Sequence, residues 1–174
     1  TSEALPLAAV SGEHPVLPQH GVVLITGGLG GLGLAIAEHF AKKSRAKLIL
    51  LGRSAFPAQT KWDQWLESHT EQDLTSQRIH RLRAMQDLGA EVLVAQADVA
   101  NLEDMRNMLS LAKQNFGKIY GVIHAAGVLE DGVIQMRTPE AVQRVFTPKV
   151  HGTVVLEQLF REDSLHFFVL CSST

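Results

Sequence analysis

The sequence predicts an α/β protein with a doubly wound parallel sheet and helices on both faces. Three observations predict this class. From residue 21 onward, short runs of Val, Ile, Leu and Phe alternate with longer segments in which apolar residues recur with the helical period. A glycine-rich loop follows the first apolar run directly, and Gly89 and Gly117 stand where two helical segments end. Right-handed crossovers between five strands then give the strand order 3-2-1-4-5.

Each expected strand is rich in the large apolar residues of a strand that is covered on both faces. The five strands are residues 22–26, 47–52, 91–97, 119–125 and 166–172. The lone cysteine, Cys171, falls in the last run, so we expect a buried strand residue. A sheet that stops at its fifth strand has an open edge, which predicts that the chain continues and adds at least one more strand.

Helices are expected between the strands, at residues 31–43, 76–88 and 102–115. The segment 138–160 begins with Thr138-Pro139, a helix cap and a first-turn proline, and is interrupted by Pro148, which predicts a bent or two-piece helix. Residues 54–75 are longer than a tight connection and are expected to hold a short extra helix.

Composition and charge exclude several classes of protein. The 174 residues suit one domain, and 45% hydrophobic with 20% charged residues exclude a disordered or fibrous chain. A formal net charge of -2 gives no bulk attraction to nucleic acid. The apolar runs are too short to cross a bilayer and no signal segment opens the chain, which predicts a soluble, cytoplasmic protein without a membrane partner. One cysteine cannot form an internal disulfide or a thiolate zinc cluster, and no metal site is expected.

Two parts of the chain are expected. Residues 1–20 contain three prolines and no sustained period, so they are interpreted as a linker or an edge extension. Residues 21–174 form the expected domain. The first residue is Thr1 and not Met, which indicates either a segment of a longer polypeptide or a processed product.

The glycine-rich loop, TGGLGGLG, joins the first strand to the first helix. It contains G-x-G-x-x-G from Gly28 to Gly33 and T-G-x-x-x-G-x-G from Thr26 to Gly33. Without Cβ atoms the backbone can approach a pyrophosphate, which the helix N-terminus attracts. Dinucleotide binding therefore outweighs a merely structural turn. The cofactor contacts expected in this loop are Thr26, Gly27, Gly28, Leu29, Gly30 and Leu32.

The end of the second strand indicates which cofactor is bound. An acidic residue there would accept hydrogen bonds from a ribose 2′-hydroxyl, but this chain has Gly52, Arg53 and Ser54. A guanidinium and a hydroxyl at Arg53 and Ser54 suit a 2′-phosphate, which favours NADPH over NADH. The alternative interpretation is that Arg53 is a solvated loop arginine.

The ends of the third and fourth strands supply further candidates, because ligands of a doubly wound sheet lie beyond the carboxyl ends of its strands. Asp98 is expected to bond the adenine, and the small residues after the fourth strand let a cofactor lie across the sheet edge. His124 is interpreted as a strand-end histidine satisfied by backbone groups, with a catalytic histidine as the alternative. The cofactor contacts expected here are Asp98, Val99, Ala125, Ala126 and Gly127.

Together the motifs TGGLGGLG, LGRS, ADV, HAAG and VFTPKVHGT, with a last strand ending in CSS, resemble the ketoreductase domain of modular polyketide synthases. This domain is a branch of the short-chain dehydrogenase/reductases, which have a Rossmann fold. The resemblance runs from about Gly21 to Thr174, and PKVHG with its spacing to CSS is its most specific part. It implies NADPH-dependent reduction of a β-ketoacyl thioester in polyketide biosynthesis. It also implies an acyl carrier protein that holds the thioester by phosphopantetheine, and neighbouring synthase domains, as partners.

The resemblance also assigns catalytic roles. Lys149 matches the lysine that this branch places ahead of the serine, and Ser173 matches that serine, with Ser172 as the fallback. The tyrosine and asparagine of the family would follow Thr174, so the fragment alone is expected to be inactive. Tyr120 lies inside the expected fourth strand and cannot substitute. In the implied reaction the serine hydrogen-bonds the substrate carbonyl and the lysine lowers the pKa of the tyrosine that gives the proton.

Topology favours the same pair, since a helix that precedes a strand begins at the carboxyl ends of the sheet. Lys149 is expected where the helix restarts after Pro148, close to Ser173. Taken singly, Lys149 could be an exposed helix lysine and Ser173 a strand-end cap. The residues Leu129, Glu130 and Asp131 stand where reductases that form a D-hydroxyl carry Leu-Asp-Asp. Asp131 matches the last residue of that pattern, so the resemblance implies a D-configured product, although Glu130 departs from it.

Two other functions remain open. One is a non-catalytic, reductase-like scaffold domain of the same kind of synthase. The other is a free-standing short-chain dehydrogenase with a small-molecule substrate.

Overall fold

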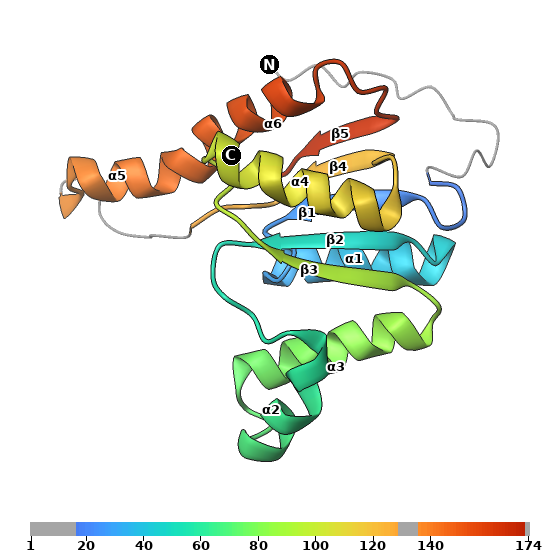
Figure 1. Ribbon diagram of the computed structural model, residues 1–174. Coiled ribbons are helices and arrows are strands. Elements are labelled where there is room, and N and C mark those ends of the chain that lie inside the picture. Colours follow the sequence, from blue (N-terminus) through green and yellow to red (C-terminus); the bar gives the residue numbers. More distant parts are fainter. Residues whose placement is uncertain (1–16, 129–135, 173–174) are drawn as a thin grey trace, which may run out of the picture.

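The computed structural model describes residues 17–128 and 136–172. The described elements form three layers, with a five-stranded sheet between two layers of helices (Figure 1). All neighbouring strands are parallel and the order is β3-β2-β1-β4-β5, which confirms the predicted order. The strands are β1 (Val22–Thr26), β2 (Lys47–Gly52), β3 (Glu91–Gln96), β4 (Gly121–His124) and β5 (Phe167–Leu170).

The helices begin and end within two residues of their predicted limits. They are α1 (Gly31–Ser44), α2 (Trp62–Ser68), α3 (Leu74–Asp87), α4 (Leu102–Phe116), α5 (Pro139–Phe146) and α6 (Gly152–Phe160). The expected extra helix is α2, which a short 3-10 turn, η1 (Gln59–Lys61), precedes. The part of the chain expected to bend at Pro148 is α5 and α6, joined by a π-helical turn, η3 (Thr147–His151).

Side chains and glycines at the helix ends account for these limits. Asp73 accepts a hydrogen bond from the Ser76 N–H at 2.8 Å at the start of α3, and Asn101 accepts two at the start of α4. Gly89 and Gly117 have φ of 88° and 81°, the left-handed region that glycine adopts without strain.

The two helical layers divide the sheet residues by alternation, because successive side chains of a strand point to opposite faces. Val23 and Ile25 of β1 pack with α1 and α3, while Val22 and Leu24 pack with α4 and α6. Figure 1 shows α1 and α3 on one side of the sheet and α4 and α6 on the other. α5 projects past the carboxyl ends of the strands, and it buries none of its residues.

β5 differs from the expectation that both faces are covered. Phe168, Val169 and Leu170 are 37%, 44% and 49% exposed. Within the described residues, β5 is an edge strand that pairs with β4 alone. Its apolar side chains are also not covered on both faces of the sheet. Cys171 was expected to be a buried strand residue, but it lies just after β5 and is half-buried. None of the described helices is long and apolar enough to cross a bilayer.

Candidate functional site

A cavity of about 170 Å³ opens where β1, β2, β3 and β4 end. The structure thus brings together segments that are far apart in the sequence, because the carboxyl ends of parallel strands meet at one edge of the sheet. Thr147 and Pro148 of the π-helical turn also line the cavity, and the sequence analysis did not predict their contribution. The predicted residues that line it are Thr26, Gly27, Arg53, Ser54, Asp98, Val99, Ala126 and Gly127.

The loop between β1 and α1 contains glycines that the fold itself requires and at least one that it does not. Gly27 has φ of 67°, and a Cβ there would lie 2.7 Å from the Ala125 carbonyl oxygen. A Cβ on Gly28 would lie 2.8 Å from the Ile25 carbonyl oxygen. The fold itself therefore excludes side chains at these two positions.

Gly31 has a different environment. A Cβ on this residue would meet no atom within 4 Å apart from its chain neighbours and its own helix, whereas one on Gly33 would collide with the Gly27 carbonyl oxygen. Gly31 stands at the first residue of α1, where free N–H groups favour an anion. The space in front of it suits a pyrophosphate. The predicted contacts omitted Gly31, although the pattern T-G-x-x-x-G-x-G contains it.

Two predicted contacts of this loop have opposite environments. The Leu29 side chain is buried in the core between the sheet and α1, so Leu29 can meet a ligand only through its backbone. Leu32 is exposed on the first turn of α1. Gly30 is less restricted than Gly27, since a Cβ there would lie 3.2 Å from the Gly27 carbonyl oxygen.

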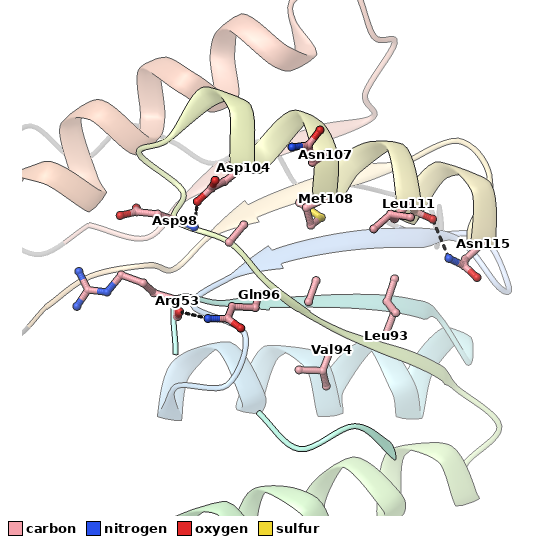
Figure 2. A pocket seen from close by; sticks show the side chains of 12 residues that line it. Arg53, Leu93, Val94, Gln96, Asp98, Asp104, Asn107, Met108, Leu111 and Asn115 are labelled. Atoms are coloured by element: carbon pink, nitrogen blue, oxygen red, sulfur yellow. Dashed lines mark hydrogen bonds between the residues drawn. The ribbon is translucent and has the colours of Figure 1, made fainter. Parts of the chain in front are cut away.

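Arg53 and Asp98 lie where this cavity meets a larger one of about 630 Å³, which runs along β3 and α4. Figure 2 shows both side chains projecting beyond the end of β3. The Gln96 side chain donates to the Arg53 carbonyl oxygen at 3.2 Å, and among the described residues no carboxylate pairs with the Arg53 guanidinium. The Asp98 carboxylate accepts from the Ala100 N–H at 3.0 Å. Arg53 is therefore available to an anion.

His124, the last residue of β4, is buried, and both of its ring nitrogens are hydrogen-bonded. Nε2 lies 3.0 Å from the Pro148 carbonyl oxygen, and Nδ1 lies 2.6 Å from the Thr26 hydroxyl oxygen. A carbonyl can only accept, so Nε2 carries the proton and Nδ1 accepts from Thr26. Burial, helped by the charge of Lys149, lowers the pKa of His124 below its ordinary value, so the ring is neutral. One partner is a backbone group, as expected, and the other is a side chain.

Lys149 lies within the π-helical turn and not at the restart of a helix, which corrects the expectation for the segment after Pro148. Its Nζ donates to the Cys171 carbonyl oxygen at 3.3 Å, and a Cβ on Gly127 would lie 3.6 Å from Nζ. The Lys149 ammonium therefore lies between the segments that follow β4 and β5, next to the cavity.

Several predicted residues are placed elsewhere or not at all. Ser173 and Asp131 lie outside the described residues, whereas Ser172, the fallback, directly follows the carbonyl that Lys149 contacts and is exposed. Tyr120 stands just before β4 and not inside it, and its ring stacks on His166 at the amino-terminal end of β5. That end of the sheet is opposite Lys149. Among the described residues, no group of His, Cys, Asp or Glu is placed to hold a metal ion.

Comparisons with known proteins give relatives of one kind. The KR domain family model matches residues 21–174. The polyketide synthase PksM of Bacillus subtilis (strain 168) is 35% identical over 93% of this chain, which covers 3% of PksM. A ketoreductase domain from the bacillaene assembly line matches with a TM-score of 0.79 and 32% identity, over 95% of this chain and 36% of that structure. L-sorbose reductase from Gluconobacter frateurii, in complex with NADPH and L-sorbose, matches with a TM-score of 0.61 and 26% identity, over 82% of this chain and 47% of that structure.

The family model covers nearly all of the chain, and the parallel sheet agrees with the fold of the solved ketoreductase domain. The chain spans only a small part of the curated relatives, which are large multidomain synthases, and about a third of the solved ketoreductase domain. By sequence and by fold, this chain belongs to the KR domain family, the ketoreductase domains of polyketide synthases.

Proposed function

We propose that this chain is part of an NADPH-dependent ketoreductase that reduces a β-ketoacyl thioester to a β-hydroxyacyl thioester in polyketide biosynthesis. The observation that carries the proposal is the position of the Lys149 Nζ, which lies 3.3 Å from the Cys171 carbonyl oxygen, beside the cavity at the strand ends.

The residues present fit NADPH. The space in front of Gly31 at the first turn of α1 suits the pyrophosphate. The guanidinium of Arg53, which no described carboxylate pairs with, lies beside Ser54 and suits a 2′-phosphate. The complex of L-sorbose reductase with NADPH supports a nicotinamide cofactor for this fold. Thr26 contributes through its backbone, because its hydroxyl is engaged by His124.

The cofactor, when bound, supplies the hydride for the β-keto carbon. The Lys149 ammonium favours the ionised form of a neighbouring phenol and so lowers the pKa of a tyrosine that gives the proton to the carbonyl oxygen. Ser173 is proposed to hydrogen-bond the same oxygen as negative charge develops on it. Asp131 is proposed to direct the substrate toward a D-configured product. The substrate is proposed to arrive on the phosphopantetheine of an acyl carrier protein, with neighbouring synthase domains as further partners.

The test uses the full-length polypeptide that carries this chain. NADPH consumption is followed with a β-ketoacyl thioester of a short pantetheine-like thiol, for the wild type and for Lys149→Ala. We expect reduction by the wild type and a loss of about 100-fold or more in Lys149→Ala, within the range that one acid–base group contributes. The variant is expected to keep its fold, since Lys149 is only half-buried.

Other outcomes would support the alternatives. A folded polypeptide that binds no NADPH would be a scaffold domain, and one that reduces small ketones but not thioesters would be a free-standing type of dehydrogenase. Analysis of the product by chiral chromatography tests Asp131 separately, because a product that is mainly the L-hydroxyl contradicts that assignment alone.

A further inference from the structure

We propose that His124 is a positioning residue, which anchors the π-helical turn at the Pro148 carbonyl and thereby sets where the adjoining Lys149 ammonium lies. The inference rests on the catalytic role of Lys149 in the proposed function. His124 itself touches neither substrate nor cofactor in this scheme.

Three elements meet at the imidazole. Thr26 ends β1, His124 ends β4 and Pro148 belongs to η3, so the two hydrogen bonds of the ring connect the centre of the sheet to the π-helical turn. Thr26 is fully buried and His124 is 3% exposed, so water does not compete for these bonds. Buried, fully satisfied hydrogen bonds of this kind hold their partners in one arrangement.

The π-helical turn leaves the Pro148 carbonyl available for this contact. In an α-helix that carbonyl would accept from the N–H of Gly152, four residues on. Here the Gly152 N–H is directed to the carbonyls of Thr147 and Lys149 instead. Pro148 also has no N–H of its own to donate to the preceding turn of the helix. The imidazole N–H of His124 therefore supplies the hydrogen bond that the Pro148 carbonyl oxygen does not receive from the Gly152 N–H.

Gly152 allows the ring and the turn to approach closely. A Cβ on Gly152 would lie 3.3 Å from the His124 Cε1 atom and 2.9 Å from a methyl carbon of Val99. The start of α6 therefore packs directly over the imidazole. This contact, together with the bond to Pro148, fixes the turn on the sheet.

The position of the turn is passed to the lysine because Lys149 follows Pro148 directly. Its Nζ makes one hydrogen bond, to the Cys171 carbonyl oxygen at 3.3 Å, among the described residues. A single long bond to a segment after β5 does not by itself fix a flexible four-carbon side chain. Within the turn, the Thr153 hydroxyl and the Gly152 N–H both donate to the Lys149 carbonyl oxygen. His124 adds the bond that holds this turn on the sheet. An uncharged imidazole can hold the Pro148 carbonyl without repelling the ammonium of the next residue, Lys149.

Two substitutions separate the two bonds of the ring. The amide nitrogen of Gln in His124→Gln reaches as far as Nε2 and can still donate to Pro148, whereas the shorter amide in His124→Asn can bond only Thr26. The matched control is His80→Asn, at an exposed position of α3. The variants are made in the full-length polypeptide.

The first readout requires no cofactor. Hydrogen exchange of residues 147–153, followed by mass spectrometry without NADPH, is expected to be about tenfold faster or more in His124→Asn. It is expected to stay within about threefold of the wild type in His124→Gln and His80→Asn, where a tenfold change equals about 1.4 kcal/mol. Equal protection in wild type and His124→Asn would overturn the inference. If His124→Asn fails to fold, His124→Leu replaces it, with the same expected increase in exchange, because leucine fills the buried site and cannot donate to the Pro148 carbonyl.

The second readout separates this inference from the proposed function. The kcat for thioester reduction is expected to fall about tenfold or more in His124→Asn with the KM for the thioester little changed, and His124→Gln is expected to restore most of it. In the Lys149→Ala background, His124→Asn is expected to cost little more, because both changes act on the same group. A full additional loss in that background overturns the positioning role while leaving Lys149 catalytic. If Lys149→Ala alone leaves kcat unchanged, the proposed function of Lys149 is wrong.

Discussion

At the scale of single residues, the glycine loop separates positions that the fold requires from a position that it leaves open. A Cβ on Gly33 would collide with the Gly27 carbonyl oxygen, whereas one on Gly31 would meet nothing within 4 Å outside its own helix. Gly33→Ala is expected to lower the free energy of unfolding by about 1–3 kcal/mol, as overpacking does. Gly31→Ala is expected to leave it unchanged or slightly higher, since alanine is the better helix former.

Gly31→Ala, which is expected to leave the stability of the fold unchanged, is expected to weaken cofactor binding. Gly31→Ala puts a methyl group where the pyrophosphate is proposed to lie, so the Kd for NADPH is expected to rise at least about tenfold in a protein of normal stability. Urea unfolding and a fluorescence titration with NADPH measure the two quantities. A stable Gly31→Ala protein that binds NADPH normally would exclude pyrophosphate binding at this position.

Arg53 gives the second prediction at this scale. Its guanidinium has no carboxylate partner among the described residues, so Arg53→Ala removes little from the fold. Charge-assisted hydrogen bonds to a phosphate contribute about 1.5–3 kcal/mol, which predicts a rise of about 10- to 100-fold in the Kd for NADPH. The Kd for NADH, which lacks the 2′-phosphate, is the control and should change much less. An equal change for both cofactors would mean that Arg53 does not read the 2′-phosphate.

Some residue roles follow from sequence and others do not. The glycine spacing and the absence of an acidic residue at Arg53 are local signals, and the structure places both at the strand-end cavity. Sequence could not show that the Thr26 hydroxyl is engaged by His124, since their side chains come from different strands. It could not show that Leu29 belongs to the core, because Leu29 and the exposed Leu32 both stand between glycines of the same loop.

At the scale of elements, the helix cap predicted at Thr138 is confirmed, since its hydroxyl accepts from the Ala141 N–H at 3.2 Å. The cap of α4, which was not predicted, gives a test of the same effect. The Asn101 side chain accepts from the N–H groups of Glu103 and Asp104 at 3.0 and 3.2 Å. Asn101→Ala is expected to lower the free energy of unfolding by about 1 kcal/mol, the usual cost of losing an N-cap. The matched control is Asn115→Ala near the other end of α4, where an exposed side chain donates to the Leu111 carbonyl oxygen of the same helix. Urea unfolding compares the two, and equal losses would rule out a capping effect.

The segment around Pro148 was predicted to be a bent or two-piece helix, and the structure has two pieces, α5 and α6, but the π-helical turn that joins them was not predicted. A proline removes an N–H, which predicts an interruption, but the helical conformation continues through the π-helical turn. The reason lies outside the segment, in the imidazole of His124, which donates to the Pro148 carbonyl oxygen, and in the close approach that Gly152 allows. Such long-range contacts leave no periodic pattern in the sequence.

At the scale of the whole molecule, the strand order followed from the βαβ pattern and the right-handed crossover rule alone. The exposure of β5 did not follow, because composition shows that a run is apolar but not which elements cover it. Phe168 and Leu170 are exposed although their run reads like that of a central strand. Local sequence therefore predicts the elements and their order better than it predicts how they are covered.

The dependence of global stability on pH provides the last prediction. The pKa of His124 lies below its ordinary value of 6.5 in the folded protein, because burial disfavours the charged ring. The unfolded chain takes up this proton near pH 6.5, while the folded protein resists it until lower pH. The contribution of the neutral His124 ring to the free energy of unfolding is thus fully present above pH 6.5. It is lost as the pH falls toward the lowered pKa of His124 in the folded protein, by at most about 1.4 kcal/mol per pH unit for one proton. The bond from Arg81 lowers the pKa of Glu38 below 4.5, so a further loss begins only below that pH.

Urea unfolding between pH 8 and pH 5 measures the first of these losses. His124→Gln has no ionisable group at this position, so its free energy of unfolding is expected to fall less than that of the wild type between pH 6.5 and pH 5. The Glu38 contribution is common to both proteins, and it acts below this range. Parallel curves for the two proteins would mean that the buried imidazole is charged as readily in the folded state as in water. A neutral ring joining Thr26 to Pro148 would then be ruled out as the arrangement that holds the π-helical turn on the sheet.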